Sequence, residues 1–421
     1  MKSERISLKI FYNFGIYLLE LAFWFGRFFS NKLKLGYLGR KNWQEELFGF
    51  RNVNTGKFIW IHCASLGEFE MARPLIEELK ENYKDELSIV LTFFSPSGFE
   101  LRKDYQLANR VFYLPLDTQY NAKKFVALLK PDLAVFVKYE FWLNYLKVLK
   151  TTGTKTILIN GIFRKSQSFF KWYGAEFRKA LKSFDHVFLQ NNQSRILLEG
   201  IGIDSITVTG DLRYDRVLAI AQNSKSYPIL DQILKDKFVL IGGSTWAEEE
   251  KLIKTLLNEV KENLRIIVAP HDISESHLTK IEKLLYGISL KRFSHLKESD
   301  EPTVILIDTI GHLSSIYKYG NAALVGGGFS GALHNILEPG VFGIPLFFGS
   351  SFRKFPEAKY FIESGIGHSI NSSTDFVMGI KSYMTNKEKC QEVKLSAARI
   401  FKANSGGTHQ VYFKIKGFLN T

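Results

Sequence analysis

The feature that most constrains this fold is a regular alternation of short apolar runs with segments of helix length, beginning near residue 50. Continuous apolar strands separated by helices are typical of a parallel sheet covered on both faces. Seven such runs occupy the first half of the chain: FIWIHCA, LSIVLTFF, RVFYLP, LAVFVKY, KTILING, HVFLQ and SITVTG.

The alternation pauses in a polar, proline-containing stretch and then restarts with FVLIGGS, LRIIVAP, TVILID, AALVGGG and IPLFFG. A chain of 421 residues also exceeds one typical core. We therefore predict two doubly wound α/β domains, in which ligands bind beyond the carboxyl ends of the strands. The predicted boundaries are 1–45 for a helical segment, 46–215 for the first domain, 216–235 for a linker, 236–374 for the second domain and 375–421 for a helical end.

The charge balance predicts an anionic partner. There are 56 Lys and Arg against 42 Asp and Glu, a formal net charge of +14. Such an excess attracts nucleic acid, anionic lipid or a phosphorylated substrate, and composition does not choose among them.

Two cysteines, Cys63 and Cys390, lie far apart and outside any zinc-ligand spacing. His62 precedes Cys63, but neighbours on a strand point to opposite faces, so this pair does not suit a thiol nucleophile. We predict that Cys63 is a buried strand residue. The low cysteine count fits a reducing cytoplasm.

The first 41 residues are rich in aromatic and apolar side chains and carry basic residues at both ends. Glu20 would lie near the middle of a bilayer if this segment spanned it, at a cost of about 2.5–3.5 kcal/mol. A helix lying in the membrane interface avoids that cost. We favour this interpretation, and the alternative is a helix packed on its own domain. The basic residues expected at anionic head groups are Lys2, Arg5, Lys9, Arg27, Lys32 and Lys34.

Ser65-Leu66-Gly67-Glu68 follows the first predicted strand and begins a helical pattern. The S-x-x-E spacing is that of a capping box, in which Glu68 accepts a hydrogen bond from a backbone N–H. The same position, at a strand's carboxyl end, suits a general base. Both interpretations stay open on the motif alone.

The second domain repeats this device. Gly242-Gly243-Ser244-Thr245 follows a strand and begins a helix, and Glu248 is spaced to complete a capping box after Thr245. Backbone N–H groups at a helix start, with the hydroxyls of Ser244 and Thr245, would also suit a phosphate.

A glycine loop, Gly326-x-Gly328-x-x-Gly331, formally matches the dinucleotide fingerprint. The acidic residue expected after the next strand is missing, since IPLFFG ends in glycine, which argues against a nicotinamide enzyme. Asn335 and Glu338 lie three residues apart on one helix face. Glu338 could bind ribose hydroxyls or merely complement the helix dipole. The chain has no D-x-D triplet, so no metal cofactor is implied.

With these pieces in view, the sequence resembles the bacterial 3-deoxy-D-manno-octulosonic acid (Kdo) transferases, which decorate lipid A precursors. The resemblance spans nearly the whole chain, including the N-terminal segment. It is carried by WIHCASLGE, KYEFW, TGDLRYD, GGSTWAEEE, APH, DTIGHLSSIY and HNILEPGVFGIPLFFG. It implies a two-domain GT-B glycosyltransferase fold and metal-independent, inverting transfer of Kdo from CMP-Kdo.

The resemblance also implies roles for residues. Glu68 matches the catalytic base that activates the acceptor hydroxyl, and Glu140 matches a second acidic position. The family's CMP-binding segments correspond here to Pro270, His271, Ile310, Gly311, His312, Asn335, Ile336, Leu337 and Glu338.

This sequence departs from the family pattern at several of these positions. Lys138 replaces the first acid of the motif that contains Glu140. Many members have arginine at His271, glutamate at His312 and proline at Ile336. Because a histidine is only partly charged near neutral pH, phosphate binding would need help from other cations.

The resemblance implies a transferase at the cytoplasmic face of the inner membrane, acting on CMP-Kdo and a phosphorylated lipid A precursor of the lipid IVA type. It implies contact with anionic inner-membrane lipid and no nucleic-acid partner. The alternatives are another GT-B nucleotide-sugar enzyme, such as an epimerase or a different glycosyltransferase, and a basic nucleic-acid-binding protein. The epimerase leaves the aromatic N-terminus unexplained, and no nucleic-acid-binding motif occurs outside that segment.

Overall fold

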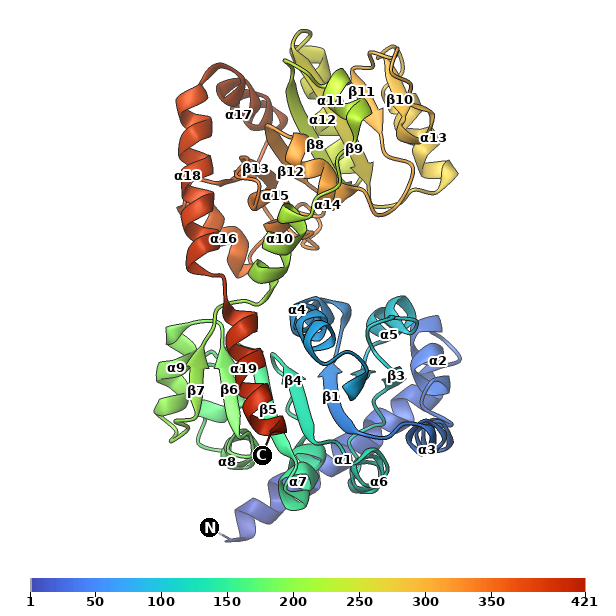
Figure 1. The fold of residues 1–421 in the computed structure, drawn as a ribbon, viewed down its shortest axis with the longest axis vertical. Helices are drawn as coiled ribbons and strands as arrows, with labels where there is room; N and C mark the ends of the chain where they lie inside the picture. Colours follow the sequence, from blue (N-terminus) through green and yellow to red (C-terminus); the bar gives the residue numbers. More distant parts are fainter. Residues whose placement is uncertain (1, 421) are drawn as a thin grey trace. The chain divides into compact units, whose positions relative to one another are not determined.

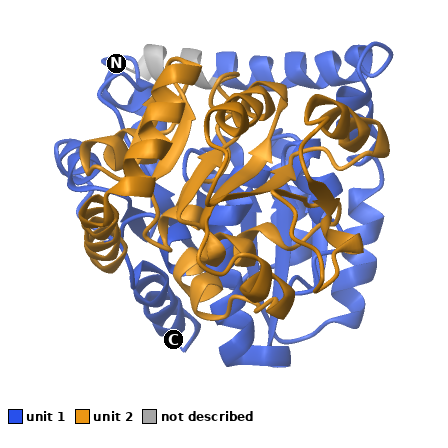
Figure 2. Cartoon of the chain, turned by 90° about the horizontal axis from the view of Figure 1, so that it is seen from above, with its two compact units in different colours: residues 1–215, 404–421 blue, residues 216–403 orange. Residues whose placement is uncertain are grey.

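A computed structural model describes residues 2–420, with side chains from residue 10 onward. The chain divides into two compact units, residues 1–215 with 404–421 and residues 216–403 (Figure 2). The last segment therefore belongs to unit 1, although it follows unit 2 in the sequence. Each unit contains a seven-stranded parallel sheet (Figure 1).

The sheet of unit 1 has the strand order β3-β2-β1-β4-β5-β6-β7. All of its pairings are parallel. The strands coincide with the seven predicted apolar runs: β1 Lys57–Cys63, β2 Leu87–Phe93, β3 Arg110–Tyr113, β4 Leu133–Val137, β5 Lys155–Gly161, β6 His186–Leu189 and β7 Ile206–Val208.

The apolar strands of unit 1 are continuous because helices cover both faces of the sheet. Phe58 and Trp60 of β1 belong to a core with α3, α6, α7, α8 and α9. The alternate residues Ile59 and Ile61 belong to a second core with α4 and α19. The helices are α1 Lys2–Gly26, α2 Asn31–Leu38, α3 Trp43–Val53, α4 Leu66–Tyr83, α5 Pro96–Arg102, α6 Gln119–Leu129, α7 Leu143–Thr152, α8 Ala175–Leu181, α9 Asn192–Glu199 and α19 Gly407–Leu419, with short 3-10 turns η1 Lys84–Glu86 and η2 Ser168–Phe170.

The sheet of unit 2 has the order β10-β11-β9-β8-β12-β13-β14. Its strands are β8 Phe238–Thr245, β9 Leu264–Pro270, β10 Leu290–Arg292, β11 Val304–Leu306, β12 Ala322–Val325, β13 Leu346–Gly349 and β14 Gly367–Ile370. Its helical elements are α11 Pro228–Ile233, α12 Ala247–Glu259, α13 Glu275–Leu284, α14 Leu313–Ile316, α15 Leu337–Gly340, α16 Pro356–Glu363, α17 Ser373–Thr385, α18 Lys387–Ala403, η3 Phe293–His295 and η4 Tyr317–Tyr319.

The segment expected as a linker, residues 216–235, is largely helical. α10 Arg213–Gln222 crosses the boundary between the units, and α11 follows it. The expected helical end, residues 375–421, is helical but is divided between the units, because α17 and α18 belong to unit 2 and α19 to unit 1.

Helix α1 has two different faces. Tyr12, Ile16, Leu19 and Phe23 form a core cluster with Leu116, Phe94 and Trp142. The remaining faces expose large apolar side chains: Ile10, Phe11, Phe14, Tyr17, Leu18, Leu21, Trp24 and Phe25. The side chains of Lys2, Arg5 and Lys9, expected at head groups, lie outside the described residues. In the described part of the chain, no helix combines the length and apolar character that crossing a bilayer requires.

Candidate active site

The carboxyl ends of β1 and β4 mark the point where the strand order of unit 1 changes direction. From β1 the chain proceeds to β2 and β3 on one side, then returns to β4 on the other side. Loops that leave two such strands diverge, and this is where doubly wound sheets bind ligands. Glu68 lies in the first turn of α4, directly after β1, and Glu140 follows β4. The topology therefore brings both predicted acidic residues to one end of the sheet.

Glu68 is buried and caps part of its own helix. Its Oε2 accepts a hydrogen bond from the Ala64 N–H at 2.5 Å. Ser65 occupies the N-cap position, but its side chain makes no capping hydrogen bond. The reciprocal capping box predicted as one interpretation is therefore incomplete, because the Ser65 side chain does not cap and the hydrogen bond to Glu68 comes from Ala64, one residue before the N-cap.

The surroundings of Glu68 raise its pKa to about 8. Burial is the main cause, followed by the nearby charge of Glu140. The N–H groups of Ala64 and Ser65 and the ammonium of Lys138 act in the opposite direction. A carboxyl group with a pKa near neutrality is suited to accept a proton during a reaction.

The turn that carries Glu140 has an unusual backbone. Lys138 adopts a left-handed conformation, with φ of 63°, directly after β4. Non-glycine residues in this region cost free energy and concentrate at functional sites. The Lys138 N–H donates to the Ile159 carbonyl at 2.9 Å, which holds the turn against β5. The Glu140 side chain that follows is only 13% exposed.

Two residues behind Glu140 were not predicted as site residues. His62 Nε2 lies 3.4 Å from Glu140 Oε2 and accepts a hydrogen bond from Trp142 Nε1 at 3.0 Å. The sequence signal for His62 is a polar residue inside an apolar strand. Cys63 itself is fully buried and belongs to the opposite face of β1, which confirms its predicted structural role. Burial also raises the pKa of its thiol.

In unit 2, β8 and β12 lie side by side where the strand order changes direction. Ser244, at the end of β8, has a left-handed φ of 52°. Thr245 is fully buried, so its hydroxyl is not exposed to a ligand.

The predicted capping role of Glu248 is wrong by one residue. Because β8 extends through Thr245, Trp246 is the N-cap of α12, and Glu249 accepts its N–H at 3.0 Å. Glu248 pairs instead with Lys251 on the surface.

Glu249 also ties the glycine loop to this helix, because its other carboxylate oxygen accepts the Gly327 N–H at 3.1 Å. A side chain at Gly326 would collide with the Ser244 carbonyl, and one at Gly328 would collide with Gly349. The close approach of β8, β12 and β13 at their carboxyl ends therefore requires these two glycines.

The segment after the glycine loop holds Asn335 and Glu338 together. Asn335 Nδ2 donates to Glu338 Oε1 at 3.0 Å, and Asn335 Oδ1 accepts the Leu337 N–H at 3.1 Å. Both polar side chains are partly exposed, whereas Ile336 and Leu337 are buried. Ile336 and Leu337 can therefore offer a ligand backbone groups but not side chains.

The remaining residues predicted to bind the CMP-Kdo donor lie at the end of β9 and after β11. Pro270 ends β9 and is buried, and His271 after it is exposed. His271 stacks on Trp246, with ring centroids 4.4 Å apart, and lies 4.7 Å from the ring of His334. Neither Trp246 nor His334 was predicted as a site residue.

Ile310 and Gly311 lie on an exposed turn before α14, where Gly311 has a positive φ of 86°. His312 follows them, and its Nδ1 lies 2.9 Å from the hydroxyl of Tyr227. His312 therefore already has a partner within unit 2.

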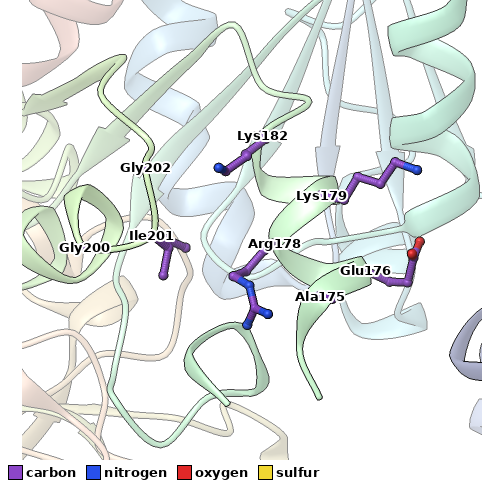
Figure 3. A pocket seen from close by; sticks show the side chains of 8 residues that line it. All are labelled: Ala175, Glu176, Arg178, Lys179, Lys182, Gly200, Ile201 and Gly202. Atoms are coloured by element: carbon purple, nitrogen blue, oxygen red, sulfur yellow. The ribbon is translucent and has the colours of Figure 1, made fainter. Parts of the chain in front are cut away.

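Figure 3 shows a basic pocket of about 700 Å³ on unit 1 that contains none of the predicted site residues. Its cations come from α8 and the residue after it, and its opposite wall, Gly200–Gly202, precedes β7. Arg178 in this pocket donates to the carbonyls of Phe169 and Lys171, which is a structural role. Among the residues that the structure describes, no three His, Cys, Asp or Glu side chains gather as metal ligands.

Comparison with known proteins identifies the family. A family model described as 3-deoxy-D-manno-octulosonic-acid transferase (kdotransferase) matches residues 41–216, which include Glu68 and Glu140. A 3-deoxy-D-manno-octulosonic acid transferase of Chlamydophila psittaci is 30% identical over 320 residues, which are 72% of this chain and 72% of that protein. This chain belongs to the Kdo transferase family. An Aquifex aeolicus Kdo transferase is 29% identical over 80% of this chain and 90% of its own length.

Solved structures place the Kdo transferase chain in the GT-B fold, as predicted. A UDP-GlcNAc 2-epimerase from Neisseria meningitidis matches with a TM-score of 0.57 and 14% identity, covering 86% of this chain and all of that one (100%). MurG from Acinetobacter baumannii matches with a TM-score of 0.55 and 10% identity, covering 86% and 99%. At such identities the likeness concerns the fold alone. The family match makes this protein a glycosyltransferase.

Proposed function

We propose that this protein transfers Kdo from CMP-Kdo to a phosphorylated lipid A precursor of the lipid IVA type, with inversion and without a metal ion. Family membership supports Kdo as the transferred sugar. The resemblance of the segments around His271, His312 and Glu338 supports CMP-Kdo as the donor. The observation that carries the mechanism is Glu68, a buried carboxyl at the carboxyl end of β1 whose pKa is raised to about 8.

In the proposed reaction, Glu68 removes the proton from an acceptor hydroxyl. The hydroxyl oxygen then forms a bond to the anomeric carbon of Kdo from the face opposite the leaving group. The bond between that carbon and the phosphate oxygen breaks, and CMP departs with the electron pair. A base of this pKa is strong enough to accept the proton, and the ionised fraction that does so, about a tenth at pH 7, grows as the pH approaches 8.

Glu140 and the N–H of Ala64 shift the pKa of Glu68 in opposite directions. The negative charge of Glu140 raises the pKa of Glu68, whereas the hydrogen bond from Ala64 lowers it. Because the same N–H also fixes the carboxylate at the start of α4, the side chain is oriented before the acceptor arrives.

On the donor side, we assign the CMP moiety to the carboxyl ends of the unit 2 strands. The Glu338 carboxylate, held by Asn335, is suited to accept hydrogen bonds from ribose hydroxyls. His271, exposed beside Trp246, can donate to a phosphate when protonated. We expect further anion contacts from backbone N–H groups of the loops after β8 and β12, other than those of Trp246 and Gly327, which Glu249 already accepts.

The acceptor is a lipid, and the exposed apolar face of α1 supports the proposed location at the cytoplasmic face of the inner membrane. Beside this face lies a pocket of about 690 Å³, to which α1 contributes Ile10, Tyr12 and Asn13. Three exposed lysines, Lys147, Lys150 and Lys179, line the same pocket. Aromatic side chains next to lysines suit the interface of an anionic bilayer.

The test is incubation with CMP-Kdo and lipid IVA, followed by mass spectrometry of the lipid. We expect a mass gain of one or more Kdo units and release of CMP. Incubation with UDP-GlcNAc is the control for the epimerase alternative, and we expect neither epimerised sugar nor UDP. Absence of a Kdo-sized gain under conditions that keep the protein folded would contradict the proposal.

A further inference from the structure

A buried chain of polar side chains lies behind Glu140. His62, on β1, is fully buried. Its Nδ1 lies 2.9 Å from Thr92 Oγ1, and Thr92 also accepts a hydrogen bond from Trp60 Nε1 at 2.8 Å. Its Nε2 faces both Trp142 Nε1 at 3.0 Å and Glu140 Oε2 at 3.4 Å.

These partners determine where a neutral His62 carries its proton. An indole N–H can only donate, so His62 Nε2 must present a lone pair to Trp142. The proton of the neutral ring then lies on Nδ1 and is donated to Thr92. In this state Nε2 and the Glu140 carboxylate, two acceptors, face each other with no hydrogen between them.

One additional proton changes this arrangement. Placed on either Nε2 or the Glu140 carboxylate, it allows a hydrogen bond between the two groups. The pair then has no net charge instead of a single negative charge. A neutral pair beside Glu68 no longer disfavours the ionised form of that carboxyl.

We propose that His62 is a positioning residue, which shares one proton with Glu140 and thereby favours the ionised form of the Glu68 carboxyl. This inference rests on the proposed role of Glu68 as the base. The Trp142 N–H opposes the shared proton, because it competes for the same nitrogen atom.

The other ionisable groups around this site are few. Lys138, Cys63 and Tyr139 act on Glu68 or are affected by its charge, in addition to Glu140. The charge of Glu140 contributes to the raised pKa of Tyr12 on α1, and the charge of Arg164 acts on Tyr139. Glu140 is the only one of these groups recorded within 4 Å of His62 Nε2 in the described residues.

Two substitutions should move the acidic limb of the pH profile of kcat/KM in opposite directions. In His62→Gln the amide cannot take up the shared proton, so Glu140 stays negative. The limb should then move to higher pH by about 0.5–1 unit. In Trp142→Phe the competing donor is lost, and the limb should move to lower pH. Trp172→Phe, at an exposed position on unit 1, is the matched control and should leave the limb in place.

A purely structural role predicts a different result. Both variants would then lower the melting temperature or kcat at every pH without moving the limb. If His62→Gln does not fold, the direction of the Trp142→Phe shift decides alone. No shift in Trp142→Phe, or a shift to higher pH, would overturn the inference.

A measurement without substrate separates this inference from the proposed function. Carboxyl carbons of ¹³C-labelled glutamate report the titration of Glu68 by NMR, with Glu68→Gln identifying the resonance. We expect the same opposite shifts in the two variants, whatever reaction the enzyme catalyses. An unchanged Glu68 titration in both variants would overturn the inference and leave Kdo transfer standing. Shifted titrations without any Kdo transfer would support the inference and contradict the proposed function.

Discussion

Glu68 combines two roles that the sequence alone could not separate. The hydrogen bond from Ala64 makes it a helix cap, and its burial beside Glu140 gives it the pKa of a base. These roles do not exclude each other, because a carboxylate that caps with one oxygen still has the other available. Capping needs only an acceptor, which glutamine also supplies, whereas proton transfer needs the carboxylate.

The raised pKa of Glu68 predicts how its substitution changes stability with pH. The folded protein holds this proton up to about pH 8, whereas an unfolded glutamate loses it near pH 4.3. Unfolding therefore releases a proton between these values, so raising the pH destabilises the folded state, by at most about 1.4 kcal/mol per pH unit.

Glu68→Gln removes this contribution. We expect the variant to gain stability relative to the parent as the pH rises from 5 to 8. Urea unfolding of both proteins at several pH values is the measurement. A stability difference that does not change with pH would contradict the raised pKa.

The donor assignment predicts that Glu338→Ala weakens CMP binding. Loss of the ribose hydrogen bonds to a carboxylate should cost about 1.5–3 kcal/mol, a loss of about 10- to 150-fold in affinity. Titration calorimetry with CMP measures this loss. Glu363→Ala, which removes a surface partner of Lys359 in the same unit, is the control and should bind CMP normally. Equal affinity in both variants would leave Glu338 with no part in binding.

At residue level, the sequence predicted positions better than contacts. The place of Glu68 followed from the order of strand, turn and helix, which the structure confirms. Glu248 was misassigned because β8 continues through Thr245, one residue beyond the predicted run FVLIGGS. His62 was missed because its partners, Thr92 and Trp142, come from other parts of the chain.

At the scale of elements, α1 has features of both interpretations of the N-terminus, a helix packed on its own domain and a helix in the membrane interface. Its inner face packs on unit 1 around Ile16 and Phe23, and Tyr12 donates to the buried Asp117 at 2.6 Å. Tyr12 also accepts the Leu143 N–H at 3.4 Å, close to the turn that carries Glu140. Removal of this helix would therefore expose part of the core as well as remove an apolar surface.

Substitutions on opposite faces of α1 should separate these roles. The triple variant Phe14→Ala, Leu21→Ala, Phe25→Ala removes exposed side chains, so we expect normal stability but at least about tenfold weaker binding to anionic liposomes. Ile16→Ala removes a buried side chain and should cost about 2–5 kcal/mol of stability. Liposome flotation and thermal unfolding are the two measurements. Undiminished flotation of the triple variant would contradict the membrane role.

The twelve apolar runs all became strands, because parallel strands covered on both faces need continuous apolar sequence. The two strands that were missed, β10 and β14, are the edges of the unit 2 sheet. Edge strands are covered less completely, and partly exposed residues in both interrupt the apolar pattern. Helix-length spacing likewise predicted most helices but not the helical nature of residues 216–235.

At the scale of the whole molecule, the chain passes from unit 1 to unit 2 and returns. α19 completes the core of unit 1 through Val411, Tyr412, Ile415 and Leu419. Nothing in the local sequence of α19 indicates this, since a helix pattern does not say which sheet it covers. The first unit should therefore need residues 404–421 for its stability.

The return of α19 can be tested with one buried and one exposed residue of that helix. Ile415 is fully buried, so Ile415→Ala should destabilise unit 1 by about 2–5 kcal/mol. Phe413 is 55% exposed, and Phe413→Ala should cost much less. Hydrogen exchange resolved along the chain should place the loss of protection in β1, α4 and α19. Loss confined to residues 216–403 would contradict this assignment.

The central claim is that this Kdo transferase family member uses Glu68 as its base, and single-turnover transfer by Glu68→Gln tests it most directly. CMP-Kdo, lipid IVA and excess enzyme are mixed, and the Kdo–lipid product is followed by mass spectrometry. A far-UV spectrum and CMP affinity equal to those of the parent establish that the variant is intact. The account predicts a loss of about 10²–10⁴-fold in the rate of transfer. A folded Glu68→Gln variant that transfers Kdo at nearly the parent rate would contradict it.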